Sequence, residues 1–61
     1  MKNIFITLTN KYNKPVAFNV NHISEFSDNN ICVDRSYGYD NYVLESFEEI
    51  LNKINETYTY S

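Results

Sequence analysis

The most restrictive feature of the chain is a helix signal near its C-terminal end. Ser46 and Glu49 have the spacing of a capping box, in which each side chain binds the other residue's backbone N–H at the helix start. Apolar residues then recur at the spacing of one helical face, at Phe47, Ile50, Leu51 and Ile54. The pattern predicts a helix from about Ser46 to Asn55 or Glu56 whose apolar stripe must lie on a sheet.

Short segments rich in β-branched and aromatic residues precede this helix and are predicted to be strands. Residues 3–9 and 15–20 alternate between inward and outward positions, and the polar residues 10–14 between them predict a hairpin. Residues 31–35 and 42–44 are predicted to be two further short strands.

Residues 21–26 are open to two interpretations. They fit a bent strand with Ile23 inward, or one helical turn that brings Ile23 and Phe26 together. The predicted fold class is α+β, a small antiparallel β-meander of three to four strands with one C-terminal α-helix packed on the sheet. Residues 1–56 are expected to form this single domain, and residues 57–61 a C-terminal tail.

The small size of the chain raises the question of what supports its core. Domains of 61 residues bury little apolar surface and often recruit disulfides, metals or a second subunit. Cys32 is the only cysteine and His22 the only histidine, so no intramolecular disulfide can form and no zinc-site spacing is present. We therefore expect self-association into a homo-oligomer, with no metal and no cofactor.

No residues in the sequence indicate catalysis. His22 and Cys32 could be imagined as a dyad, but Cys32 is more simply interpreted as a small, half-buried strand residue. Glu48 and Glu49 point apart because adjacent helix positions do not face each other. With one glycine, the chain has no glycine-rich loop to hold a phosphate. We predict a non-enzymatic protein.

The charge of the chain disfavours binding to nucleic acid. Its formal net charge is −3, from eight acidic and five basic residues, and the basic residues are scattered rather than clustered. The longest purely apolar run is Ile4-Phe5-Ile6, too short for a transmembrane helix or a signal peptide. The expected location is the cytoplasm of a bacterium or of a phage-infected host cell.

Tyrosines supply the candidate interaction surface. The chain has six, and tyrosine and arginine are enriched at binding hot spots because they combine a large contact area with a polar end. We predict a protein-binding patch formed by Tyr12, Arg35, Tyr37 and Tyr39. The alternative is that these rings only cover the edges of the core.

Three stretches resemble the FlbD family of short bacterial proteins, which are often encoded beside flagellar genes and have relatives on phage genomes. The stretches are residues 6–9, 18–23 and 42–50, in the order that the family has. Members of the family have no assigned catalytic residues, so the resemblance implies the fold and leaves a flagellar role as one possibility.

The sequence thus predicts a non-enzymatic protein–protein interaction module. A small phage-encoded inhibitor that acts by occluding a host or defence protein is the candidate that we favour within this class. The alternatives are a flagellar or assembly accessory protein of FlbD type, or a homo-oligomer that binds a small nucleotide-like ligand between its subunits.

Overall fold

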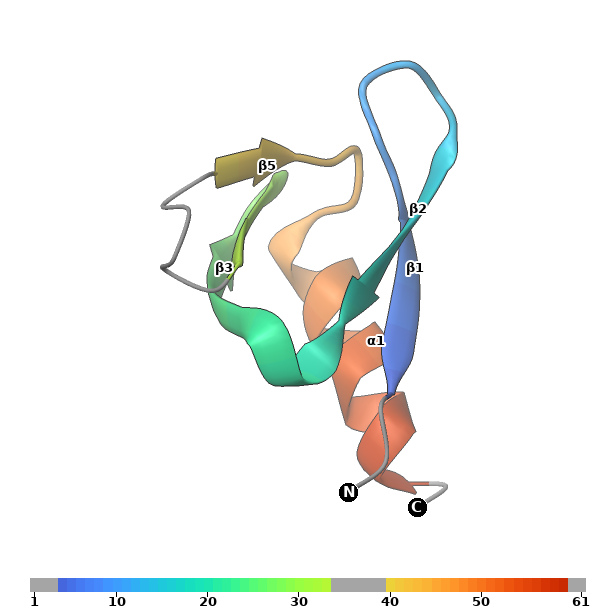
Figure 1. Cartoon of the computed structure of the whole chain (residues 1–61), viewed down its shortest axis with the longest axis vertical. Coiled ribbons are helices and arrows are strands. Elements are labelled where there is room, and N and C mark those ends of the chain that lie inside the picture. Colours follow the sequence, from blue (N-terminus) through green and yellow to red (C-terminus); the bar gives the residue numbers. More distant parts are fainter. Residues whose placement is uncertain (1–3, 34–39, 60–61) are drawn as a thin grey trace.

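The computed structural model describes residues 4–33 and 40–59 (Figure 1). These residues form five strands followed by one helix: β1 (Phe5–Thr9), β2 (Pro15–Asn19), β3 (Ile23–Ser27), β4 (Asn30–Val33), β5 (Asp40–Tyr42) and α1 (Phe47–Thr59). The strands pair antiparallel and α1 packs against β1 and β3, so the predicted α+β class with a C-terminal helix is confirmed. No helix in the described ranges has the length and apolar character needed to cross a membrane.

The strands form two small sheets rather than one meander of three to four strands. β1 pairs with β2 in one sheet, and the second sheet has the order β3-β4-β5. The break lies at a 3₁₀ turn, η1 (Val20–His22), where the side chain of Asn19 accepts the backbone N–H of Asn21 at 2.9 Å. Asparagine commonly forms such a local bond, which here ends β2 and redirects the chain into the second sheet.

β1 and β2 form the predicted hairpin, in which Ile6 lies opposite Phe18. Asn10 closes its turn, because its Oδ1 atom accepts the backbone N–H groups of Tyr12 at 2.9 Å and Lys14 at 3.0 Å. Asn13 has a φ of 65°, in the left-handed region that asparagine tolerates better than most residues. The side chain of Asn10 and the left-handed backbone of Asn13 thus form a turn that contains no glycine.

The strand predicted over residues 42–44 is shifted, because β5 ends before Val43. The N–H of Val43 donates to the carbonyl of Asn29 at 3.0 Å, and the N–H of Leu44 donates to the carbonyl of Thr9 at 2.9 Å. These two residues therefore pair with a turn and with the end of β1 instead of extending a strand. They tie the second sheet to the first.

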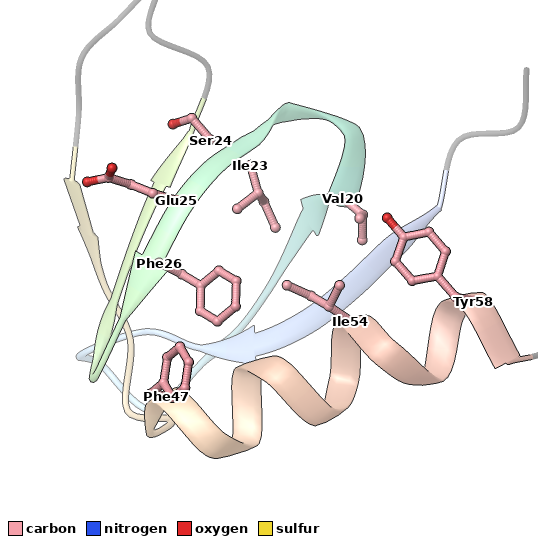
Figure 2. A pocket seen from close by; sticks show the side chains of 8 residues that line it. All are labelled: Val20, Ile23, Ser24, Glu25, Phe26, Phe47, Ile54 and Tyr58. Carbon is pink, nitrogen blue, oxygen red and sulfur yellow. The ribbon is translucent and has the colours of Figure 1, made fainter.

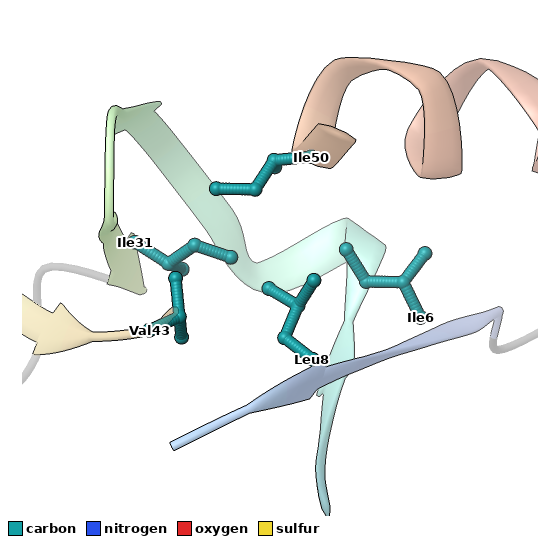
Figure 3. Packing of buried hydrophobic residues seen from close by; sticks show 5 residues of the cluster. All are labelled: Ile6, Leu8, Ile31, Val43 and Ile50. Atoms are coloured by element: carbon teal, nitrogen blue, oxygen red, sulfur yellow. The ribbon is translucent and has the colours of Figure 1, made fainter. Parts of the chain in front are cut away.

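The core lies where α1 faces both sheets (Figure 3). Its buried members come from β1, from β4, from the segment before α1 and from α1 itself: Ile6, Leu8, Ile31, Val43 and Ile50. Partly buried side chains surround them: Phe18, Val20, Ile23, Phe26, Val33 and Ile54. One residue of the predicted inward stripe departs from this pattern, because Phe47 stays 39 % exposed.

The helix begins as the capping box predicted. The N–H of Ser46 donates to Glu49 Oε1 at 2.9 Å, and the N–H of Glu49 donates to Ser46 Oγ at 3.3 Å. Asp28 adds a third partner from the β3–β4 turn, accepting the N–H of Phe47 at 2.6 Å. Its carboxylate also places negative charge at the positive end of the helix dipole.

We expect Ser46→Ala to lower the free energy of unfolding by about 1 kcal/mol, because the N–H of Glu49 loses its acceptor. Urea unfolding of wild type and variant measures this change. Ser46→Asp keeps an acceptor at the same position and should remain close to wild type. A midpoint that does not change in Ser46→Ala would show that Asp28 alone is enough to start the helix.

The helix is longer than predicted, since it continues to Thr59 rather than ending at Asn55 or Glu56. Part of the segment expected as a tail over residues 57–61 therefore belongs to the helix. Thr57 Oγ1 donates to the carbonyl of Ile54 at 2.6 Å, and Tyr58 follows Ile54 by one turn on the same face. The prediction missed that this apolar stripe extends one more turn.

Candidate functional site

An open groove of about 390 Å³, lined by both apolar and polar residues, lies between β3 and α1 (Figure 2). Its walls come from η1, β3 and the face of α1 that turns toward them: Val20, Ile23, Ser24, Glu25, Phe26, Phe47, Ile54 and Tyr58. The volume is at the lower end of the range for ligand pockets, about 300–1,000 Å³. The groove can therefore take a few large apolar side chains.

A β-bulge in β3 makes one wall of the groove. Residues three apart on a regular strand point to opposite faces, so Ile23 and Phe26 would not normally lie together. The register of β3 against β4 shifts between Ile23 and Glu25, which adds one residue to β3. Ile23 then pairs with Val33 and Phe26 with Ile31, and both β3 side chains face α1.

The second wall is formed by the apolar stripe of α1, before and after the buried Ile50. Phe47, Ile54 and Tyr58 follow one another at helical spacing, and all three point into the groove (Figure 2). Phe47 stacks on Phe26, with ring centroids 5.3 Å apart and ring planes at 22°. This stacked pair closes one end of the groove, and Tyr58, which is 63 % exposed, lies at the other end.

The polar groups at the groove offer little reactivity. Ser24 Oγ donates to the main-chain carbonyls of Cys32 at 3.1 Å and Val33 at 3.4 Å, so the hydroxyl bridges the two strands at the bulge. Glu25 is exposed and is the one charged residue of the wall, but its side chain points away from α1 and from the groove (Figure 2).

The histidine and the cysteine do not form a recognisable site. His22 is exposed in η1, and Cys32 is half-buried on β4, where its Sγ lies 3.8 Å from the carbonyl oxygen of Val33. Within residues 4–33 and 40–59, no group of three or more His, Cys, Asp or Glu side chains is placed to hold a metal ion.

The predicted tyrosine patch is only partly described. Tyr12 lies in the β1–β2 turn, is 70 % exposed, and has Lys11 Nζ at 5.3 Å from its ring centroid. Arg35, Tyr37 and Tyr39 lie outside the described residues. The turn that carries Tyr12 is at the far end of the hairpin from the C-terminal turns of α1 (Figure 1), so Tyr12 does not contribute to the groove.

The groove residues were present in the prediction but with another role. Ile54 was predicted in the apolar stripe of the helix and Ile23 as an inward residue, whereas Tyr58 fell in the predicted C-terminal tail. The spacing of Tyr58 after Ile54 was the available signal, since it continues the apolar stripe by one turn.

Comparison of the chain with protein-family models, with curated proteins and with solved structures finds no match in any of the three. The resemblance to the FlbD family stays a prediction from the three stretches of sequence.

Glu45, which lies outside the groove, has an environment that shifts its pKa. Glu45 accepts two hydrogen bonds from Thr9, from the backbone N–H and from Oγ1, both at 2.9 Å. Partial burial acts to raise the pKa of the Glu45 carboxyl, but the bonds from Thr9 and the positive charge of Lys53 outweigh it and the pKa is lowered. The two hydrogen bonds between Thr9 and Glu45 link the end of β1 to the segment before α1.

We expect Glu45→Gln to destabilise the protein most at neutral pH. The folded state lowers the pKa of Glu45, so the unfolded state binds more protons as the pH falls. The contribution is therefore present above the ordinary carboxyl pKa of about 4.3 and is lost as the pH falls through the folded-state value. Urea midpoints measured from neutral pH to about pH 3 should show the two proteins converging.

Thr9→Val removes the hydroxyl donor and keeps the shape of the side chain. It should give a smaller effect of the same sign, because the backbone N–H of Thr9 still binds the carboxylate. A difference between wild type and Glu45→Gln that stays constant over the whole pH range would contradict the role given to the ionised carboxylate.

Proposed function

We propose that this protein is a non-enzymatic protein-binding module and that the groove between β3 and α1 is its binding surface. The observation that carries the proposal is a groove at which two large aromatic side chains of α1 remain exposed beside the buried core. Phe47 and Tyr58 lie on the apolar side of α1 and yet remain 39 % and 63 % exposed, whereas Ile50 is fully buried. The exposed parts of these aromatic side chains are contact area that a partner can cover.

Binding at such a surface is favoured by the burial of apolar area and by the aromatic residues themselves. Removing apolar surface from water gives about 25 cal/mol per Å², and tyrosine is among the residues that dominate interface energies. Among the described residues, the other large exposed side chains are spread over other parts of the chain: Phe5, Tyr12, Tyr42 and Leu44. At the groove, the exposed Phe47 and Tyr58 of α1 line one wall, and the partly buried Ile23 and Phe26 of β3 line the other.

The bonding at the groove also supports binding rather than catalysis. A nucleophile needs a base within hydrogen-bond distance and a third group that orients the base. Ser24 Oγ instead donates to main-chain carbonyls, and the exposed Glu25 side chain points away from the groove. What the groove presents to a partner is its shape and a mixture of apolar and polar surface.

Affinity capture with two matched variants tests the proposal. We expect Tyr58→Lys to reduce the captured partner by about tenfold, because it places a charge in the groove at a hot-spot residue. Tyr42→Lys is the control, since Tyr42 is exposed to a similar extent at 54 % but lies outside the groove. It should capture as much partner as wild type.

Unfolding midpoints close to wild type would show that both variants remain folded. Equal capture by wild type, Tyr58→Lys and Tyr42→Lys would contradict the assignment of the groove as the binding surface. Equal loss in both lysine variants would mean that the added charge, and not its position in the groove, decides binding.

A further inference from the structure

We infer that β2 pairs along its outer edge with β2 of a second copy of this chain, so that two hairpins form one four-stranded antiparallel sheet. β2 contributes no residue to the groove, so this contact goes beyond the proposed function. Three features carry the inference: the direction of the backbone groups of β2, the small size of the β1–β2 sheet, and the match of β2 with itself across a two-fold axis at Ala17.

The hydrogen-bond pattern of the hairpin directs the backbone of Ala17 away from β1. Bonded and non-bonded residue pairs alternate along an antiparallel ladder. The N–H of Val20 donates to the carbonyl of Ile4 at 2.8 Å, and the pair of Thr7 and Ala17 lies three residues further along, at a non-bonded position. The N–H and C=O of Ala17 therefore point to the outer edge of β2, where no other described strand pairs with them.

The outer edges of the neighbouring strands are less suited to pairing. Thr9 in β1 already bonds to the segment before α1 through both its N–H and its C=O. β3 has a bulge between Ile23 and Glu25, and β5 has three residues. β2 offers five residues in regular register and without charge. Pro15 lacks a donor, but it lies at the start of the strand and its carbonyl can still accept.

The β1–β2 sheet is small enough to gain from further strands. A sheet of two strands is marginal in water, and three or more strands are needed for independent stability. The turn end of this hairpin projects beyond the other elements (Figure 1). Domains of this size often recruit a second subunit. Pairing of β2 with its copy doubles the sheet to four strands.

The side chains of β2 favour a second copy as the added strand. A two-fold axis at Ala17, the middle residue, pairs β2 with itself over its whole length. Val16 then lies opposite Phe18 of the second copy, and this pair occurs twice. Pairs of aromatic and β-branched residues stabilise neighbouring strands, and both side chains are only half-buried in one copy. Lys14 falls opposite Val20 of the second copy, so like charges do not meet.

Sedimentation equilibrium of the full chain tests the inference. Two paired strands of five residues bury less than a standard interface, so we expect a dimer that forms between about 10 μM and about 1 mM. The mass should rise over this range from 7.2 kDa toward twice that value. A monomer at every concentration would overturn the inference.

A matched pair of lysine variants locates the contact. Ala17→Lys places two like charges opposite each other at the axis and should weaken the dimer about fivefold. Thr7→Lys is the control, because Thr7 is exposed on β1 directly beside Ala17. Its two copies are three strand spacings apart, roughly 14 Å, where salt screens their repulsion. It should dimerise as wild type does, and equal weakening in both variants would contradict pairing through β2.

Mixing two variants provides the sharper test. Ala17→Glu alone should also weaken the dimer, whereas an equal mixture of Ala17→Lys and Ala17→Glu should dimerise at least as well as wild type, because opposite charges then meet at the axis. A mixture that associates no better than either variant alone would overturn the two-fold axis at Ala17.

Hydrogen exchange of the wild-type protein keeps the inference testable even if these variants fail to fold. The amide of Ala17 should exchange more slowly as the concentration rises, because the second copy supplies its acceptor. The amide of Phe18, which faces β1, should change much less. A dimer that leaves exchange at Ala17 unchanged would place the contact elsewhere on the molecule and overturn the inference. The capture experiment with Tyr58→Lys decides the proposed function separately.

Discussion

Ile50→Ala should lower the free energy of unfolding by about 2–5 kcal/mol. Ile50 is fully buried, and it projects from α1 toward Leu8 and Ile31 in the centre of the core (Figure 3). The loss combines the transfer free energy of the deleted atoms with the cost of the cavity that they leave. For a domain whose total stability is about 5 kcal/mol, a loss at the upper end of this range would leave much of the protein unfolded at room temperature.

Urea unfolding followed by circular dichroism measures this effect, with Leu51→Ala as the matched control. Leu51 is the next residue on α1 and is only half-buried, so its truncation should cost about 1–2 kcal/mol. Equal losses in the two variants would show that α1 does not sit on the sheets through the face that carries Ile50.

Asn29→Ala should lower the free energy of unfolding by about 2–4 kcal/mol, although the asparagine side chain is polar. Asn29 Nδ2 donates to the carbonyls of Leu44 at 3.0 Å and Glu45 at 3.1 Å. The backbone N–H of Asn29 also donates to the carbonyl of Glu45, and its carbonyl accepts the N–H of Val43. Its φ of 59° is a left-handed conformation that costs alanine about 1–2 kcal/mol. The substitution therefore removes two hydrogen bonds and strains the backbone at the residue that fixes the segment before α1.

Two further variants separate these causes. Asn29→Gly tolerates the positive φ and loses the side-chain bonds, so it should cost about 1–2 kcal/mol. Asn13→Ala carries the same φ cost in the exposed hairpin turn and should cost about 1 kcal/mol. If Asn29→Ala were no worse than Asn13→Ala, the Nδ2 bonds would contribute nothing to stability.

Features that depend on a few neighbouring residues were predicted well. The capping box of Ser46 and Glu49 formed as expected, and so did the hairpin with Pro15 at the start of β2. In both cases the interacting residues lie within one helical turn or one hairpin, so the local sequence pattern is enough to predict the structure.

Features that depend on distant partners were missed. The bulge at Ser24, which turns Ile23 and Phe26 to one side, is defined only by the pairing of β3 with β4. The end of β5 was misplaced because Val43 and Leu44 bond to residues far away in the sequence. Local spacing carries no signal for either arrangement.

The sequence alone established the α+β class, the start of the helix and the alternation that turns Ile6 and Leu8 inward, because each follows from the fixed periods of helices and strands. The tertiary structure decided the split into two sheets and the groove. Phe47 and Ile50 belong to one apolar stripe, yet only Ile50 is fully covered. Periodicity tells which side of an element is apolar, but how much of that side becomes buried depends on what the rest of the chain places against it.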